Sequence, residues 1–235
     1  MLQISVPAPK MITIAAQVTT AYKYLSPRHA TSMLERGSIR VGTLSEYRSW
    51  EGADVRGDHG EGTKITTSAP EPTTYAYGSP IHRWLFSKGI RVAGSIFASG
   101  DNAVVYRQRH PDCFVFCASE SFSPVLMEKF GGACVKVTNP TMFFQALHTG
   151  FSQHLQWLGL TVQEAIMDRC NYVERRQPYF DQSPKHPCFL KPPDFREEAE
   201  VRAVWLASGG VIKPVVLELP CLKQYLSLIS DAKSP

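Results

Sequence analysis

The order of apolar and polar positions along the chain predicts helices and strands that are mixed without a regular alternation. Residues 19–26 are rich in Thr and Tyr, which favours a strand. A helix is predicted to follow, because Ser26 suits its N-cap, Pro27 its first position and Gly37 its end. The segment SIRVGTL, 38–44, reads as another short strand. The chain is therefore expected to open with strand, helix and strand.

The regular pattern is lost after this opening. We expect a long irregular loop region over 45–80, and an N-terminal extension over 1–18. Beyond the loop region, 90–98 and 103–109 have strand character and flank the turn signal Ser-Gly-Asp-Asn. This arrangement predicts a hairpin.

The second half of the chain continues in the same mixed manner. Strands are predicted at CFVFCAS, 113–119, and at ACVKVT, 133–138, followed by a helix over 139–158 with apolar residues at helical spacing. Thr161 and Glu164 form a possible capping box for a second, short helix. A late strand, EEAEVRAVWLA, precedes a Gly-Gly turn. The mixture predicts the α+β class.

Composition limits the class of protein. The chain has 235 residues, of which 43% are hydrophobic and 20% charged, and this favours one globular domain over 1–235. The net charge of +4 is scattered, so nucleic-acid binding is permitted but not indicated. No apolar run approaches the roughly 20 residues that span a bilayer. The six cysteines are dispersed without CxxC spacing, which predicts reduced thiols and a cytoplasmic location.

The late strand carries a candidate catalytic group. Side chains alternate along a strand, so Glu198, Glu200 and Arg202 are expected on one face, with Val201 and Trp205 on the other, apolar face. The two carboxylates would lie about 6.6 Å apart along the strand. Each carboxylate would raise the pKa of the other, while Arg202 would lower the pKa of the carboxylate beside it. The two acids could then have different pKa values and different roles. A solvated, charge-balanced sheet face remains the alternative.

An acidic, glycine-rich stretch, WEGADVRGDHGEGTK, lies within the predicted loop region. Asp54, Asp58, His59 and Glu61 are hard metal ligands, but their spacing does not match an EF-hand. Neither GxxxxGK[ST] nor GxGxxG is present, so the stretch is not a phosphate-binding loop. We interpret it as a mobile flap whose Asp58, His59 and Glu61 contact a partner. A plain flexible surface loop remains the alternative.

Two His-Pro pairs precede cysteines, and their side chains could form a zinc site. His110 and Cys113 occur in HPDC, and His186 and Cys188 in HPC, which together would supply Cys2His2 ligands. The spacings are irregular, and Cys113 begins an apolar strand that reads as core. The sequence therefore predicts no metal site.

Three segments in this order resemble a large group of uncharacterised bacterial domains that are often associated with phages or defence. The segments are YKYLSPRHATSMLERGSIRVGTLSEYR, FVFCASESFSPVLMEKFGGACVKVTNP and FREEAEVRAVW. The intervening DHGEG also resembles a recurring element of that group. The layout further resembles the ADP-ribosyltransferase-like fold, which implies a single α+β domain with a mixed or antiparallel split sheet and few helices.

The resemblance also implies a site. Glu200 or Glu198 would be the catalytic acid, beside Arg202. The middle strand would be CASES, and NAD would be the cofactor. Its nicotinamide and ribose would face residues of the first and middle strands, namely Tyr22, Lys23, Tyr24, Ser119 and Ser121. The first strand lacks the Arg or His often found in that fold, and the Ser-Thr-Ser motif is absent.

We therefore expect an NAD-dependent ADP-ribosyltransferase-like toxin or defence effector that modifies a protein or nucleic acid and binds no membrane. One alternative is a non-enzymatic, defence-related binding module that uses the 45–80 region. Another is a metal-dependent nuclease or hydrolase using Asp54, Asp58, Glu61 and Glu198. The acceptor and the oligomeric state are left open by the sequence.

Overall fold

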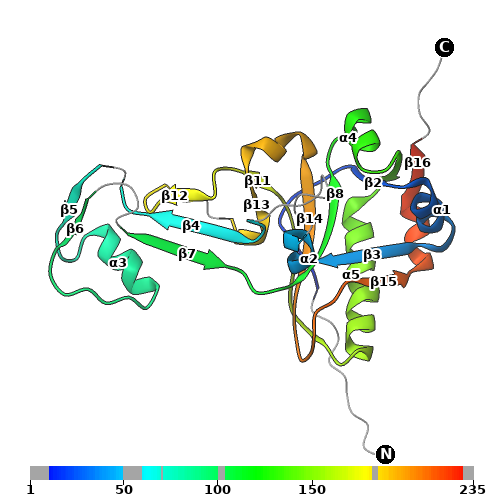
Figure 1. The fold of residues 1–235 in the computed structure, drawn as a ribbon. Coiled ribbons are helices and arrows are strands. Elements are labelled where there is room, and N and C mark those ends of the chain that lie inside the picture. Colours follow the sequence, from blue (N-terminus) through cyan, green and yellow to red (C-terminus); the bar gives the residue numbers. More distant parts are fainter. Residues whose placement is uncertain (1–10, 50–59, 70, 100–103, 182–184, 230–235) are drawn as a thin grey trace, which may run out of the picture. The chain divides into compact units, whose positions relative to one another are not determined.

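The computed structural model describes residues 11–49, 60–69, 71–99, 104–181 and 185–229. Their contacts group the chain into two compact units (Figure 1). The first unit comprises Met1–Glu61, Pro111–Cys170 and Phe195–Pro235, and the second comprises Gly62–His110 and Asn171–Asp194. The single domain expected over 1–235 stays a prediction.

The first unit is built on one large sheet. Within the described residues its strands run in the order β1-β10-β14-β8-β2-β9-β16, and β3 and β15 branch from β8. Only β1 and β10 pair in parallel among these strands. The bounds are β1 Thr13–Ile14, β2 Ala21–Leu25, β3 Ser38–Thr43, β8 Phe114–Ser119, β9 Ala133–Val137, β10 Thr161–Arg169, β14 Glu200–Ser208, β15 Val215–Glu218 and β16 Leu226–Ile229.

The sheet is split at its central strand, β8. One end of β8 pairs with β2 through Tyr22 and Ser119. The other end pairs with β3, where Gly42 and Thr43 lie opposite Val115 and Phe114. Two groups of strands, β2-β9-β16 and β3-β15, therefore pair with the same edge of β8, one group at each end. Mixed sheets with a few helices confirm the predicted α+β class.

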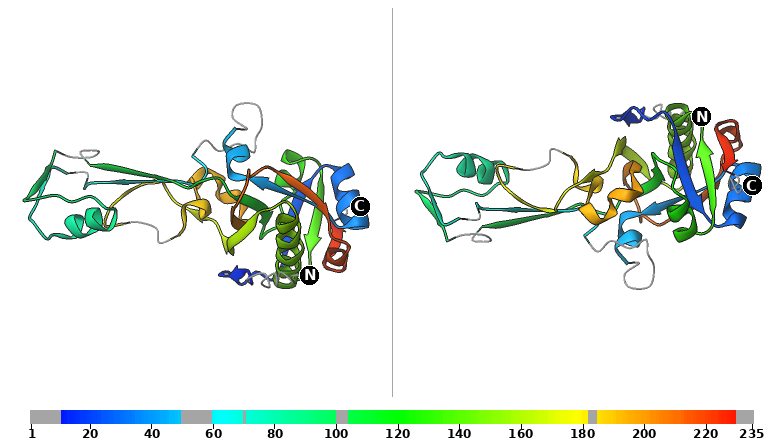
Figure 2. Two further views of the ribbon diagram at one scale, coloured as in Figure 1. Left: turned by 90° about the horizontal axis from the view of Figure 1, so that it is seen from below. Right: turned by 90° about the horizontal axis from the view of Figure 1, so that it is seen from above.

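The helix α5, Pro140–Trp157, covers one face of this sheet (Figure 2). The Asn139 side chain caps it by accepting the Met142 N–H at 3.2 Å. The apolar spacing that predicts the helix also supplies the core, because Phe143, Leu147 and Phe151 are fully buried with the apolar sheet residues. This core therefore packs against the face of the sheet that α5 covers.

Shorter helices close the ends of the first unit. They are α1 Pro27–Arg36, α2 Leu44–Ser49, α4 Pro124–Lys129 and η3 Pro220–Tyr225. The helix predicted after Ser26 is confirmed as α1, and it ends at Gly37 with a left-handed φ of 65°. A Cβ at Gly37 would lie 2.1 Å from the Leu219 carbonyl oxygen, so only glycine fits this approach.

The second unit is smaller. It contains β4 Thr63–Thr67, β5 Thr73–Tyr75, α3 Pro80–Ser87, β6 Ile96–Ala98, β7 Val105–Arg109, β11 Asn171–Tyr172, β12 Arg176–Pro178, η1 Pro187–Phe189 and β13 Leu190–Lys191. The strand β4 lies between β12 and β7. A small core of Tyr75, Ile81, Leu85 and Ala98 joins α3 to β5 and β6. The chain passes from the second unit to the first through η2, Pro193–Glu198.

Three local predictions are wrong. The 45–80 region is not irregular throughout, because its described part contains most of α2 together with β4 and β5. The two strands predicted to form a hairpin do not pair with each other: β6 pairs with β5, and β7 pairs with β4. The helix predicted at Thr161 is the strand β10, which pairs with β14.

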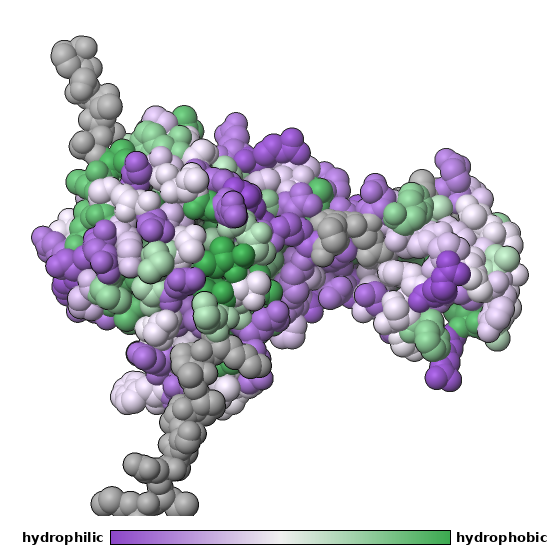
Figure 3. Space-filling view, turned by 180° about the vertical axis from the view of Figure 1, so that it is seen from behind, coloured by the Kyte–Doolittle hydropathy of each residue, from purple (hydrophilic) through white to green (hydrophobic). Residues whose placement is uncertain are grey.

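Hydrophobic and hydrophilic residues are interspersed over the face of the first unit seen in Figure 3. In the part of the chain that the structure describes, no helix is both long enough and apolar enough to cross a membrane.

Candidate functional site

A buried charge cluster lies on the sheet face opposite α5. Arg202 donates to both oxygens of Glu200, with Nε to Oε1 at 2.5 Å and Nη2 to Oε2 at 3.2 Å. Arg202 also binds both oxygens of Glu61, with Nη2 to Oε2 at 3.1 Å. The three residues are 2–6% exposed. One guanidinium thus holds two carboxylates in a place that water scarcely reaches, in a geometry that gives strong hydrogen bonds.

The alternation along β14 produces this arrangement. Val201, Ala203 and Trp205 belong to the apolar core with α5. Glu200 and Arg202 therefore face the other way, as predicted. They are not solvated, however, and the alternative of an exposed charged face is wrong for these two residues.

Two further titratable groups adjoin the cluster. The Cys117 thiol lies on the neighbouring strand β8, opposite Arg202, and hydrogen-bonds to the Glu200 carboxylate. The Tyr47 hydroxyl, from α2, lies 4.0 Å from the Cys117 sulfur. Burial and then the Glu200 charge raise the pKa of Cys117 to about 12. Burial, Cys117 and Glu200 raise the pKa of Tyr47 well above its usual value.

The guanidinium of Arg202 carries the positive charge of the cluster. Burial on its own would lower the pKa of Arg202, but Cys170 and the carboxylates of Glu200 and Glu61 raise it well above its usual value. The guanidinium is therefore always protonated. Its positive charge favours the charged form of the carboxylates that it binds, and charges interact strongly in such a low-dielectric place.

Glu200 is also aligned with two of the residues predicted to bind NAD. Glu200 pairs with Ser119 across β14 and β8, and Ser119 pairs with Tyr22 across β8 and β2. Directly paired residues point to the same face of a sheet and have Cα atoms about 4.5–5.5 Å apart. Tyr22, Ser119 and Glu200 therefore form one row across three adjacent strands.

Aromatic rings lie beside this row, around β2. The Tyr22 ring lies 5.8 Å from that of Phe122, which is 39% exposed. The Tyr24 ring stacks on Phe130 at 6.3 Å. The Tyr24 hydroxyl donates to the carbonyl of Ser121 at 2.9 Å.

Lys23 has the opposite strand parity to its two tyrosine neighbours. Its Nζ donates to the Cys117 carbonyl at 2.6 Å and lies 4.7 Å from the centre of the Phe116 ring. The Ser119 hydroxyl donates to the carbonyl of Ser121 at 2.7 Å. Of the five residues predicted to bind NAD, Tyr22 and Ser119 thus share the face of Glu200, and Tyr24 follows Tyr22 on the same face of β2.

Glu198 does not share the strand face with Glu200. It is the last residue of η2, and its carboxylate lies 4.0 Å from Lys129 Nζ. Ala199 has a positive φ of 41°, and β14 begins only at Glu200. This left-handed residue interrupts the alternation on which the prediction was based.

The acidic stretch is only partly described. Asp54, Asp58 and His59 lie outside the described residues. Glu61 does not lie on an exposed flap, since it is 2% exposed and bound to Arg202. The expected partner contact of Glu61 is therefore replaced by an ion pair within the first unit.

Sequence reasoning missed Tyr47 and Cys117. Both lie beside Glu200 through long-range packing, and the sequence offered no motif for either. It also set aside His110, His186 and Cys188, which are the only group with possible metal-ligand geometry among the described residues. Glu61, Glu198 and Glu200 form no such group within the described ranges.

Comparisons with protein-family models, with curated proteins and with solved structures found no match to this chain.

The environment of Cys117 predicts its reactivity. At pH 8 a thiol with a pKa of about 12 is ionised in about one molecule in ten thousand, so Cys117 should react very slowly with a disulfide reagent. Cys221 is the exposed cysteine and should react first. We expect one fast thiol in the native chain and six after denaturation, measured by release of thionitrobenzoate. Fast labelling of the half-buried Cys117, located by peptide mapping, would contradict the raised pKa of its thiol.

Proposed function

We propose that the first unit is an ADP-ribosyltransferase-like domain that uses NAD as donor and modifies a macromolecule. The observation that supports this function best is the row Tyr22, Ser119 and Glu200 on one face of a split sheet. The resemblance to the ADP-ribosyltransferase-like fold implies that these three residues lie close together. Their strands are far apart in the sequence and adjacent in the fold.

The chemistry of the reaction suits a fixed carboxylate at Glu200. Breaking the bond between nicotinamide and ribose develops positive charge on the ribose, as in other glycosyl transfers. An anion held in place beforehand stabilises that charge without reorganising. Arg202 is a positioning residue, because it binds both oxygens of Glu200 and fixes their orientation.

The aromatic residues beside the row suit a planar ligand. Tyr22 and Phe122 form a tilted pair that is part-exposed, next to Ser119. Aromatic rings bind flat rings by stacking and bury their apolar surface. The nicotinamide ring of NAD is such a group, and it must leave as the ribose reacts.

Glu200→Gln tests this proposal. The substitution keeps the shape of the side chain and removes its charge, so NAD turnover by the full chain should fall by about 100-fold or more. Nicotinamide release from NAD, followed by chromatography, measures the rate. Glu164→Gln is the matched control, because Glu164 is an exposed glutamate on the same sheet and should leave the rate unchanged.

Thermal unfolding separates loss of catalysis from loss of folding, because Arg202 retains Glu61 as a partner in Glu200→Gln. A folded Glu200→Gln chain with the wild-type rate would overturn Glu200 as the catalytic acid. Absence of NAD turnover in the wild type with every acceptor class tried would overturn the transferase.

A binding module is the second candidate function, and the second unit carries the observation in its favour. It exposes large apolar side chains around α3, β5 and β6, with Tyr77 74%, Phe86 63% and Phe97 68% exposed. Exposed aromatic residues are enriched at protein interfaces. This function requires no NAD turnover, so the same assay discriminates between the two.

A further inference from the structure

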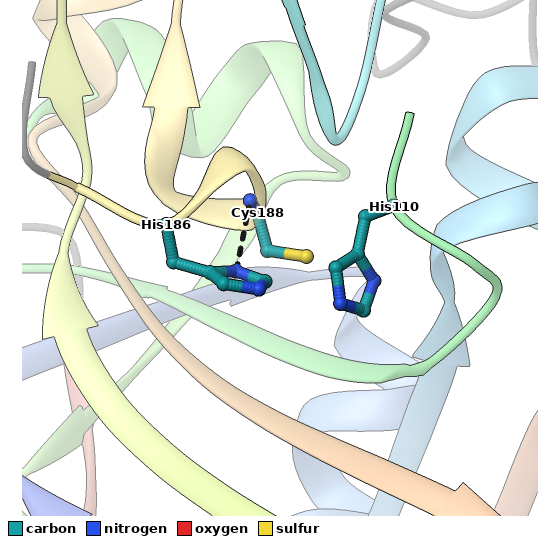
Figure 4. A group of neighbouring side chains, drawn as sticks. All are labelled: His110, His186 and Cys188. Atoms are coloured by element: carbon teal, nitrogen blue, oxygen red, sulfur yellow. Dashed lines mark hydrogen bonds between the residues drawn. The ribbon is translucent and has the colours of Figure 1, made fainter. Parts of the chain in front are cut away.

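Two histidines and a cysteine converge within the second unit (Figure 4). His110 follows the end of β7, and His186 and Cys188 stand at the start of η1. One nitrogen of each imidazole and the Cys188 sulfur all lie within 4.8 Å of one another. The two imidazole rings are 4.5 Å apart between centroids and inclined at 67°.

The backbone around these residues is held by the fold. The His110 N–H donates to the Gly62 carbonyl at 2.9 Å, which extends the pairing of β7 with β4. The helix η1 contacts β4. His186 caps η1 through its ring nitrogen Nδ1, which accepts the Cys188 N–H at 3.3 Å. Residues 76 positions apart in the sequence are thus brought to one place by β4.

The donor set and its burial suit zinc. Imidazole nitrogen and thiolate sulfur are the ligands that Zn²⁺ prefers, and bonds of about 2.0–2.3 Å in a tetrahedron place ligand atoms about 3.3–3.8 Å apart. Since the three ligand atoms lie within 4.8 Å of one another, each pair must close by at most about 1.5 Å to reach that separation. Cys188 is fully buried and both histidines are half-buried, so the ion would be partly screened from bulk water.

Burial also decides against a nucleophilic role for the same residues. A Cys–His pair that attacks a substrate must present its sulfur to that substrate. Cys188 has 0% exposure, so a macromolecule does not reach its sulfur. Binding of a metal ion among the three side chains requires no access for a macromolecule.

We propose that His110, His186 and Cys188 bind one Zn²⁺ ion, with water in the fourth position. The weak contact between the Cys188 N–H and His186 Nδ1 is lost on binding: His186 binds through one ring nitrogen, and the other carries the proton. The ion ties the end of β7 to η1 and so stabilises the second unit. This site is independent of the proposed transferase, whose residues belong to the first unit.

Metal analysis of the full chain tests the proposal. After dialysis against metal-free buffer, we expect about one zinc per chain. His110→Ala and Cys188→Ser should each weaken zinc binding by more than the roughly 10- to 100-fold that loss of an outer-sphere partner causes. Two variants serve as matched controls, His154→Ala on α5 and Cys221→Ser in η3, and both should keep the zinc.

Two further measurements cover the case in which the buried Cys188→Ser chain fails to fold. Co²⁺ added to the zinc-free wild type should give the near-ultraviolet absorption of a cobalt–thiolate bond, which His110→Ala weakens. A chelator should lower the Tm of the wild type and leave that of His110→Ala unchanged. Zinc content equal in wild type and His110→Ala, or cobalt binding without thiolate absorption, would overturn the site.

Discussion

Arg202→Met should destabilise the folded chain by about 3–5 kcal/mol, because it leaves the carboxylates of Glu61 and Glu200 buried without their cation. Two anions close together in a low-dielectric place also repel each other. Denaturant unfolding followed by circular dichroism measures the loss. Arg36→Met is the matched control: the Arg36–Glu218 ion pair is exposed, so its loss should cost less than about 1 kcal/mol.

A compensated variant distinguishes the charge effect from a packing effect. Arg202→Met combined with Glu61→Gln and Glu200→Gln removes all three charges and keeps similar side-chain volumes. This triple variant should recover most of the free energy of unfolding, since apolar and neutral replacements of buried ion pairs are often tolerated. If the single and triple variants are equally unstable, the cluster contributes through its shape and not its charges.

Trp205→Ala should cost about 3–5 kcal/mol, the range found when a buried aromatic side chain is truncated. Trp205 is fully buried, and its ring lies 5.0 Å from that of Phe151 on α5. Its indole N–H donates to His148 Nδ1 at 3.0 Å, so truncation also removes a buried hydrogen bond. The free energy of unfolding measures the effect.

Trp157→Ala is the control for this prediction. Trp157 ends the same helix, α5, but is 81% exposed. Its truncation should change the free energy of unfolding by about 0.5 kcal/mol or less. Equal losses in the two variants would mean that α5 does not pack on the sheet through Trp205.

The late strand shows what the sequence can predict. Alternation over Val201–Trp205 correctly separates the core face from the polar face, because period-2 patterning is a local property of the backbone. The same reasoning fails at Glu198. Ala199 adopts a left-handed conformation that its residue type disfavours, and no local pattern announces it.

Long-range pairing accounts for the other differences. Glu61 pairs with a residue 141 positions later, so its burial could not be read from the acidic stretch around it. At Thr161, a local capping signal is overridden by the pairing of β10 with β14 along nearly its whole length. The predicted hairpin fails for the same reason, since β6 and β7 each take another partner.

The candidate zinc ligands could be found in the sequence, but their proximity to one another could not. The sequence supplied His110, His186 and Cys188, but irregular spacing hid that β4 places them together. Cys113, the fourth candidate, is assigned to the first unit and buried there. A spacing rule works when all ligands come from one local turn, and here they come from two segments.

The chain crosses between its two units four times, at 61–62, 110–111, 170–171 and 194–195. The second unit is thus assembled from two separate insertions, and β4 and β12, which pair with each other, come from different ones. During synthesis, more than a hundred residues are added after β4 before β12, its second neighbour in the sheet, has been made. No single truncation removes this unit while leaving the first intact, and a protease cut at one crossing leaves the two units joined by the other three.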